Sequence, residues 1–153
     1  MHRAGHARVL SGIAAVALVF STGLVAQDKP AESGKLAVSV QYTAKGTVDK
    51  DHQIWIWLFD NPDSSSWANT PPLAVGQLSE NGAAYKFGEL PKQVYIAMAF
   101  DEKGGYDGTS GAPPTGTPIG IYGMASGGSP AAVETGADDK AVKTTFDDSM
   151  RMP

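Results

Sequence analysis

The sequence predicts an all-β protein, folded as an antiparallel β-sandwich of two sheets with about seven strands. Short segments with alternating apolar and polar side chains, or with two apolar faces, recur between turns rich in Gly, Pro, Asn and Asp. No segment after residue 26 combines helical periodicity with helix caps. Several short strands separated by turns are typical of a two-sheet sandwich.

The strongest strand signals lie in the first half of the chain. Residues 35–42 place four apolar side chains on one face, namely Leu36, Val38, Val40 and Tyr42. Residues 53–60 are apolar on both faces, with Ile54, Ile56 and Leu58 on one and Trp55, Trp57 and Phe59 on the other. Such a strand is either central and covered on both sides or the carrier of an exposed aromatic platform.

Shorter patterns predict further strands at residues 72–78, 83–87, 94–100, 119–123 and 141–146. Asn81-Gly82 predicts a tight hairpin between the first two of these strands, because this pair supplies the positive φ angles of a type I′ turn. Residues 101–118 and 124–139 are rich in glycine and predict loops. A loop as long as the first of them is usually functional or disordered.

The first 26 residues predict a cleavable Sec-type signal peptide. Arg3 and Arg8 precede an apolar run, and the small residue Ala26 suits the position before the cut. The alternative is an uncleaved membrane anchor, although the apolar stretch is short and interrupted by polar residues. We therefore expect a signal at 1–26, a flexible tether at 27–34 and one domain at 35–153, soluble in the periplasm or outside the cell.

Composition narrows the possible partners of the exported part. The chain contains no cysteine, which excludes disulfides, thiolate metal sites and a lipid-modified cysteine. Without the signal, ten Lys and Arg face sixteen Asp and Glu, a formal net charge of about −6. Such a charge argues against nucleic acid and against anionic membranes as partners.

Several motifs occur in an order that resembles a known architecture. They are Leu36-x-Val38-x-Val40, Gly46-Thr47-Val48, Phe87-Gly-Glu-Leu-Pro91, Gly111-Ala112-Pro113 and Tyr122-Gly-Met-Ala-Ser126. This order resembles the prealbumin-like and carboxypeptidase-regulatory-like sandwiches. More closely, it resembles a family of small exported bacterial proteins of unknown function within that architecture. The resemblance spans residues 36–147 and implies the same two-sheet fold.

Acidic residues in the loops suggest a calcium site. If the strands run alternately up and down, the loops with Asp49 and Asp51, with Glu80, and with Asp101 and Asp107 fall at one end of the sandwich. Calcium takes six to eight oxygen ligands in a flexible arrangement. Asp101 and Asp107 are the predicted ligands, with Asp49 and Asp51 as additional ones. The alternative is that acidic residues collect in loops because loops are hydrated.

Aromatic residues suggest a second kind of site. Trp55 and Trp57 share a strand face, and Trp67 follows in the next loop. An exposed face of this kind stacks on sugar rings, which would make the protein a carbohydrate-binding module. The alternative is that these tryptophans are core residues, since large exposed apolar patches are uncommon on soluble monomers.

Catalysis has little support in the sequence. His52 is the only histidine after the signal, and no pattern places a base against a nucleophile. We therefore expect a non-enzymatic binding or structural accessory protein with no cofactor except calcium, and with a protein or glycan partner. The carbohydrate-binding module is the alternative, and a small secreted hydrolase is the third reading.

Overall fold

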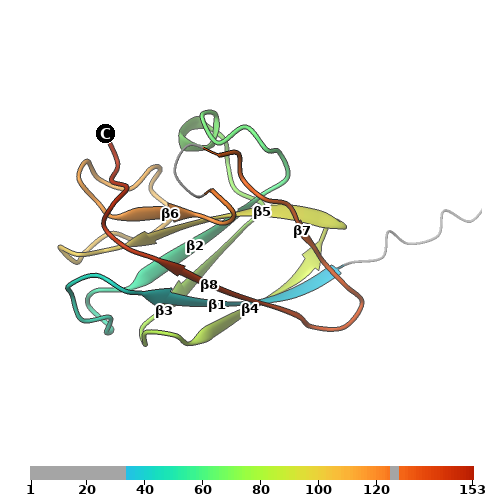
Figure 1. Cartoon of the computed structure of the whole chain (residues 1–153), viewed down its shortest axis with the longest axis horizontal. Coiled ribbons are helices and arrows are strands. Elements are labelled where there is room, and N and C mark those ends of the chain that lie inside the picture. The colour runs from blue at the N-terminus through green and yellow to red at the C-terminus, as the bar shows by residue number, and fades with distance from the viewer. Residues whose placement is uncertain (1–33, 125–127) are drawn as a thin grey trace, which may run out of the picture.

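The computed structural model describes residues 34–124 and 128–153, and it confirms an all-β chain with two sheets. Figure 1 shows the sheets as two layers, one above the other. Their strands are β1 (Gly34–Tyr42), β2 (Ile54–Phe59), β3 (Ala74–Leu78), β4 (Ala84–Leu90), β5 (Gln93–Phe100), β6 (Ile119–Ile121), β7 (Val133–Glu134) and β8 (Lys140–Phe146). The predicted signal and all of the predicted tether except Gly34 lie outside the described residues.

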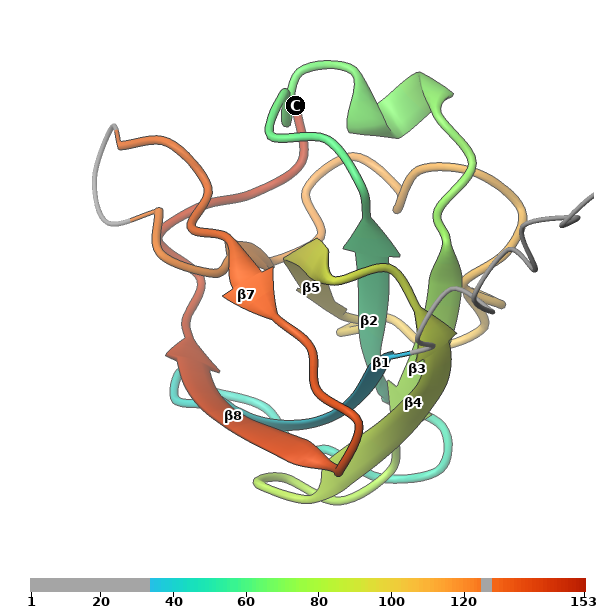
Figure 2. The ribbon, with the colours of Figure 1, turned by 90° about the vertical axis from the view of Figure 1, so that its right-hand side faces the viewer.

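The smaller sheet has the order β4-β1-β8 and corrects the prediction of a purely antiparallel sandwich. β1 is antiparallel to β4 but parallel to β8, with Leu36 opposite Lys140 and Tyr42 opposite Phe146. The reason is the route of the chain before β8. It crosses from β7 in the other layer, as Figure 2 shows, and such a crossover can deliver a strand parallel to its neighbour.

The larger sheet has the order β3-β2-β5-β6, and all of its pairs are antiparallel. β2 and β5 lie at its centre, so β2 has a neighbour on each side. The short strand β7 also pairs with β5, further along the edge on which β6 pairs. Beside β6, Met150 and Met152 form backbone hydrogen bonds with residues 116–119.

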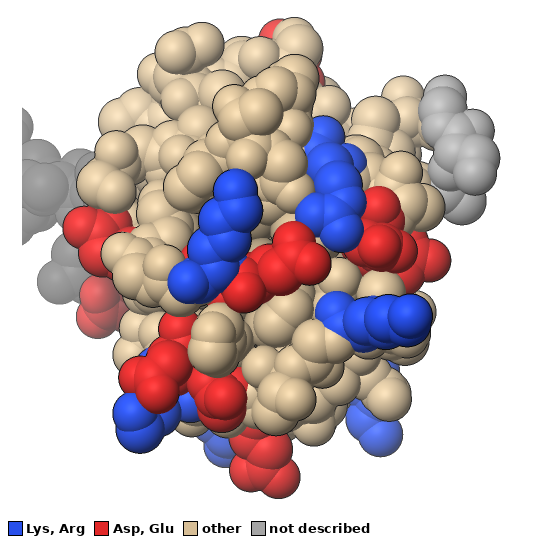
Figure 3. All heavy atoms as spheres, turned by 90° about the vertical axis from the view of Figure 1, so that its left-hand side faces the viewer, with Lys and Arg blue, Asp and Glu red and all other residues tan. Residues whose placement is uncertain are grey.

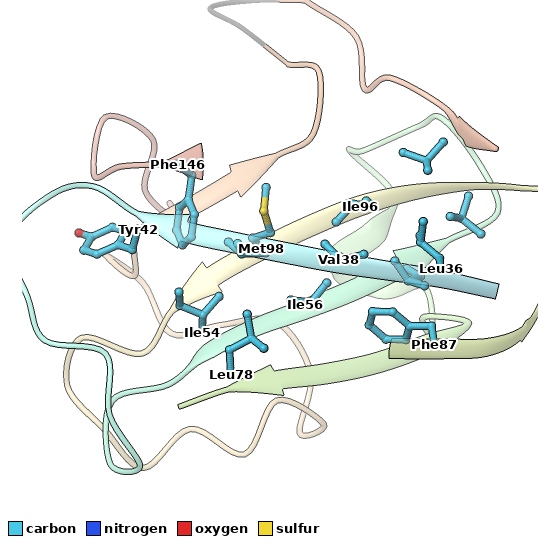
Figure 4. Packing of buried hydrophobic residues seen from close by; sticks show 14 of the residues in the cluster. Leu36, Val38, Tyr42, Ile54, Ile56, Leu78, Phe87, Ile96, Met98 and Phe146 are labelled. Atoms are coloured by element: carbon cyan, nitrogen blue, oxygen red, sulfur yellow. The ribbon is translucent and has the colours of Figure 1, made fainter. Parts of the chain in front are cut away.

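The main core fills the space between the two sheets. Figure 4 shows its side chains directed toward one another from β1, β2, β3, β4, β5 and β8. The predicted alternation is confirmed in β1 and β5, whose inward residues are buried: Leu36, Val38, Val40, Tyr42, Val94, Ile96, Met98 and Phe100. Ile54, Ile56 and Leu58 of β2 join this cluster, so their side chains occupy the inner face of the larger sheet.

The connection at Asn81-Gly82 is not the predicted β-hairpin. β3 and β4 belong to different sheets, so this turn links the two layers. Gly82 has a φ of 81°, whereas Asn81 is not among the residues with positive φ, which excludes a type I′ turn. The Asn81 side chain instead binds β1: its Oδ1 accepts the Tyr42 N–H at 2.8 Å, and its Nδ2 donates to the Tyr42 carbonyl at 2.8 Å.

Two elements were not predicted from the sequence. A 3-10 helix, η1 (Trp67–Asn69), follows the turn after β2, and β7 has only two residues. β4 also continues to Leu90 through a bulge, where Glu89 adopts a φ of 57°. Among the described residues, no helix is long and apolar enough to span a membrane.

Removing the Asn81 side chain should loosen the connection between the layers. We expect Asn81→Ala to lower the free energy of unfolding by about 1 to 2 kcal/mol, because two hydrogen bonds to the Tyr42 backbone are lost. Urea unfolding measures the change. Glu80→Ala in the same loop is the matched control and should change stability by less than about 0.5 kcal/mol. Equal losses in both variants would contradict this role of Asn81.

Candidate functional site

The outer face of the larger sheet carries a second, separate apolar cluster. Its buried members are Trp55, Trp57, Phe59, Trp67 and Ala99. Trp55 and Trp57 are each 7% exposed, so the prediction that β2 is covered on both sides fits better than an exposed platform. Small residues on β5 make room for the indoles, since Trp55 lies opposite Ala99 and Trp57 opposite Ala97.

The loop 101–118 covers part of this cluster. The Trp57 Nε1–H donates to the Gly108 carbonyl at 2.9 Å. Gly108 lies so close to Trp55 that a Cβ atom there would be 2.0 Å from the indole ring. Tyr106 packs edge-on against Trp55, with ring centroids 6.0 Å apart. The loop 101–118 is therefore held against β2 by its contacts with the indole rings of Trp55 and Trp57.

Polar contacts inside the same loop fix its shape. The buried Asp101 accepts the Tyr106 backbone N–H at 2.9 Å through Oδ2. The Tyr106 hydroxyl donates to the Gly111 carbonyl. Burial, reinforced by the nearby charges of Asp107 and Asp101, raises the pKa of Tyr106 to about 12. Tyr106 therefore stays a neutral hydrogen-bond donor at any physiological pH.

The segment 61–72 covers another part of the outer face. Trp67, the first residue of η1, stacks on Phe59 with centroids 4.6 Å apart and ring planes within 3° of parallel. Its Nε1–H lies 3.1 Å from the Asn61 carbonyl and 3.2 Å from Asn61 Oδ1. Trp67 is thus held by stacking on β2 and by hydrogen bonding to the first residue of its own segment.

A cavity of about 750 Å³ lies between these covers. Its floor and aromatic wall consist of Trp57, Phe59, Trp67, Val75, Ala97, Ile119 and Ile121. Further wall residues come from η1 and its flanks, from loop residues 108–113, and from Met152 and Pro153. In Figure 2 the last residues of the chain and the segment after β2 both lie above the larger sheet. The lining is mainly apolar, and no charged side chain of the described residues belongs to it.

The three predicted ligand-binding tryptophans therefore divide into two groups. Trp57 and Trp67 line the cavity, whereas Trp55 is packed under Gly108 and Tyr106 and is not part of the lining. The Trp55 Nε1 is buried without a hydrogen-bond partner in the described part of the chain, so packing alone holds this ring. The cavity also uses Phe59, which the sequence places on the same aromatic face as Trp57, and Ile119 and Ile121, which the sequence predicts only as parts of a strand.

The loops that carry the predicted calcium ligands do meet at one end of the sandwich. The Asp101 N–H donates to the Gln53 carbonyl at 2.8 Å, and Gly104 lies against the Asp51 backbone. However, Asp49, Asp51, Asp101 and Asp107 do not converge. Within residues 34–124 and 128–153 there is no group of three or more acidic, histidine or cysteine side chains that could hold a metal ion.

Local hydrogen bonds explain why these carboxylates point to different places. Asp49 Oδ1 accepts the backbone N–H groups of Asp51 and His52, each at 2.9 Å, and contacts His52 Nδ1 at 3.0 Å. These contacts lower the pKa of Asp49, with the backbone hydrogen bond from Asp51 as the largest cause. Asp107 Oδ1 likewise accepts the N–H groups of Thr109 and Ser110, which lower its pKa. The carboxylates of Asp49 and Asp107 each order their own turn, and a calcium ion shared among these loops stays a prediction.

Acidic and basic side chains lie next to one another at this loop end, as Figure 3 shows. Arg151 pairs with Glu102 at 3.0 Å and with Asp148 at 3.2 Å, and Lys50 pairs with Asp51 at 2.6 Å. These pairs are largely exposed, so each contributes little to stability. At this end of the sandwich each of these basic side chains lies next to an acidic one, so these residues do not form a patch of one charge.

A second hollow of about 510 Å³ lies beside β7. It is lined by Gly34, Lys92, Gln93, Glu134, Thr135, Gly136 and Ala137. The Thr135 hydroxyl already donates to the Pro91 carbonyl at 2.7 Å. A largely polar hollow offers a ligand little apolar surface to bury, so the aromatic cavity is the better candidate site.

No protein-family model matches this chain, and no curated protein is significantly similar to it. The functional argument therefore rests on the geometry of the site.

Adding one methyl group at Gly108 should lift the loop off β2. We expect Gly108→Ala to lower the free energy of unfolding by about 2 to 4 kcal/mol, because it combines a clash with Trp55 and a φ of 71°. Gly105→Ala is the matched control: its φ is 90°, but nothing lies within 4 Å of its Cβ position, so about 1 to 2 kcal/mol is expected. Urea unfolding, followed by tryptophan fluorescence, compares the two, and equal losses would show that the Trp55 contact does not matter.

Calcium should have no effect on stability if each carboxylate serves only its own turn. We expect the thermal midpoint to be the same in excess calcium and in chelator, because a ligand held only by the folded state would raise it. Magnesium serves as the control for general ionic effects. A rise of the midpoint in calcium alone would support the predicted calcium site at Asp101 and Asp107.

Proposed function

We propose that this protein is an exported, non-enzymatic β-sandwich that holds a small, largely apolar ligand in the aromatic cavity. The observation that carries the proposal is the cavity itself, with a volume of about 750 Å³ and a mainly apolar lining. Ligand sites for drug-sized molecules commonly enclose about 300 to 1,000 Å³ and combine apolar walls with a few polar groups. The cavity matches that description in both size and lining.

The position of the cavity supports a binding role. It lies on the outer face of the larger sheet, while the main core fills the space between the sheets. The two apolar clusters share no buried residue. A ligand can therefore enter or leave the cavity without opening the main core.

The aromatic walls are already fixed without a ligand. The indole N–H of Trp57 is used by Gly108, and that of Trp67 is used by Asn61. Phe59 is held in the stack with Trp67. Preformed walls favour affinity, because side chains that are already ordered lose little conformational entropy on binding.

The lining favours an apolar ligand over a glycan. Sugar recognition on a sandwich face needs exposed rings and many hydrogen-bonding side chains, but Trp57 is 7% and Trp67 8% exposed. Four of the five polar side chains around the cavity lie on residues 64–70, at one wall. A largely apolar ligand gains more from such a lining than a polyol does.

The lining also supports a non-enzymatic role. Among the described residues, no Asp, Glu, His, Lys or Arg side chain lines the cavity. Ser64 and Ser65 are present, but a serine nucleophile needs an adjacent base. The cavity therefore provides binding surface without general acid–base groups.

Export and the finer fold assignment belong to the same proposal. The order of charged, apolar and small residues in 1–26 supports a cleaved signal. The sequence motifs and the strand orders β4-β1-β8 and β3-β2-β5-β6, with first and last strands parallel, support a prealbumin-like architecture.

Binding can be tested with the neutral fluorescent probe N-phenyl-1-naphthylamine and the purified protein. We expect the probe to bind, and Ala97→Leu to weaken binding at least about tenfold, because Ala97 forms part of the cavity floor. Ala112→Phe at the exposed rim is a second variant that should weaken binding without disturbing the sheet. Ala141→Leu on the exposed part of β8 is the matched control and should bind like the wild type.

Three results would overturn the proposal. One is the absence of probe binding to a folded protein. Another is binding that neither cavity variant weakens, which would place the probe elsewhere. The third is displacement of the probe by soluble oligosaccharides together with a shift in tryptophan fluorescence, which would favour the carbohydrate-binding module.

A further inference from the structure

The aromatic cavity has two chemically different sides. The floor consists of β2, β3, β5 and β6 side chains, which are all apolar or aromatic. The polar side chains Ser64, Ser65, Asn69 and Thr70 all come from the segment that contains η1, and only Thr109 lies on the opposite loop. A ligand in this cavity therefore meets hydrocarbon below and neutral polar groups along one wall.

Most of these polar groups already have partners. The Thr70 hydroxyl donates to the Ser66 carbonyl at 2.9 Å, and the Ser65 hydroxyl donates to Asp63 Oδ1 at 2.6 Å. Thr109 Oγ1 lies 3.4 Å from Asp107 Oδ1. Within the described part of the chain, the half-buried Ser64 hydroxyl and the Asn69 amide make no hydrogen bond to another residue. Among the polar side chains of the lining in the described part of the chain, these two keep both a free donor and a free acceptor for a polar group of a ligand.

The lining also selects against ionic ligands. A charged group moved from water into an apolar site without a counter-ion pays a large desolvation penalty. The surface of this protein carries many charged side chains, but no charged side chain of the described residues lines the cavity. Neutral ligands are therefore favoured over carboxylates and phosphates of the same shape.

The shape of the walls favours a ring over a flexible chain. Trp57, Phe59 and Trp67 present rigid, flat side chains, and Phe59 and Trp67 are parallel to within 3°. Aromatic pairs gain from stacked or edge-on contacts, and a rigid ring loses less conformational freedom on binding than an alkyl chain.

From these observations, and resting on the proposed function, we infer that the ligand is an uncharged ring compound with one neutral hydrogen-bonding group. The ring lies over Trp57 between the Phe59–Trp67 pair and Ile119, and its hydroxyl or amide faces Ser64 and Asn69. Both side chains can serve either kind of group, since hydroxyls and amides donate and accept hydrogen bonds.

Ligands with one skeleton and different polar groups test this inference. We expect 2-naphthamide to displace the neutral probe about tenfold more tightly than naphthalene, and 2-naphthoate to bind more weakly than either. Octanamide, which has the amide on a flexible chain, should bind more weakly than 2-naphthamide. The double variant Ser64→Ala/Asn69→Ala should reduce 2-naphthamide binding to the level of naphthalene and leave naphthalene binding unchanged. Ser79→Ala in the exposed loop between β3 and β4 is the matched control.

The outcomes separate the ligand class from the proposed function. If naphthalene binds as tightly as 2-naphthamide, or the double variant has no effect, the assigned polar contact is wrong while the binding cavity stands. If 2-naphthoate binds most tightly, the exclusion of charge is wrong, and if octanamide equals 2-naphthamide, the ring preference is wrong. If none of the compounds binds and the neutral probe also fails to bind, the proposed function itself is wrong.

Discussion

The burial of both faces of β2 is the constraint on which the rest of this structure depends. Its inner residues complete the core between the sheets, whereas its outer aromatic residues must be covered by other parts of the chain. Exposed indole and phenyl rings would leave several hundred Å² of apolar surface in water. The smaller sheet cannot provide this cover, because it packs against the inner face. Two irregular segments, 61–72 and 101–118, therefore take that role.

The nature of this cover explains why a cavity exists. A second sheet would cover the outer face of β2 with closely packed side chains. The two loops, in contrast, contact this face at only a few positions. Those contacts are the hydrogen bond of Trp57 to Gly108, the stacking of Trp67 on Phe59, and the close approach of Gly108 to Trp55. Between them the loops separate, and the space is not filled by side chains. The cavity exists because the two loops contact the flat aromatic face of β2 only near its edges.

Local patterns in the sequence predicted what depends on local physics. Alternation identified the inward residues of β1 and β5, and the two apolar faces of β2 left two interpretations, of which burial on both faces is the one observed. Long-range pairing was beyond such patterns: Asn81-Gly82 has the composition of a hairpin, yet its strands enter different sheets, and nothing near β8 indicates a parallel partner. The loops of Asp49 and Asp101 did gather as expected. Their carboxylates nevertheless turned inward to backbone N–H groups of their own loops, a choice that spacing alone does not reveal.

The residues around the cavity differ in how strongly they couple binding to folding. Trp57, Phe59 and Trp67 belong both to the cavity wall and to the buried outer cluster, so any change in them alters stability together with the shape of the site. Ser64 is half-buried and Asn69 and Ala112 are exposed, so these side chains contribute little to either core. Ligand preference can therefore change through the loop residues while the aromatic wall is retained. The sandwich in this way separates a fixed apolar floor, required for folding, from a rim whose chemistry is free to vary.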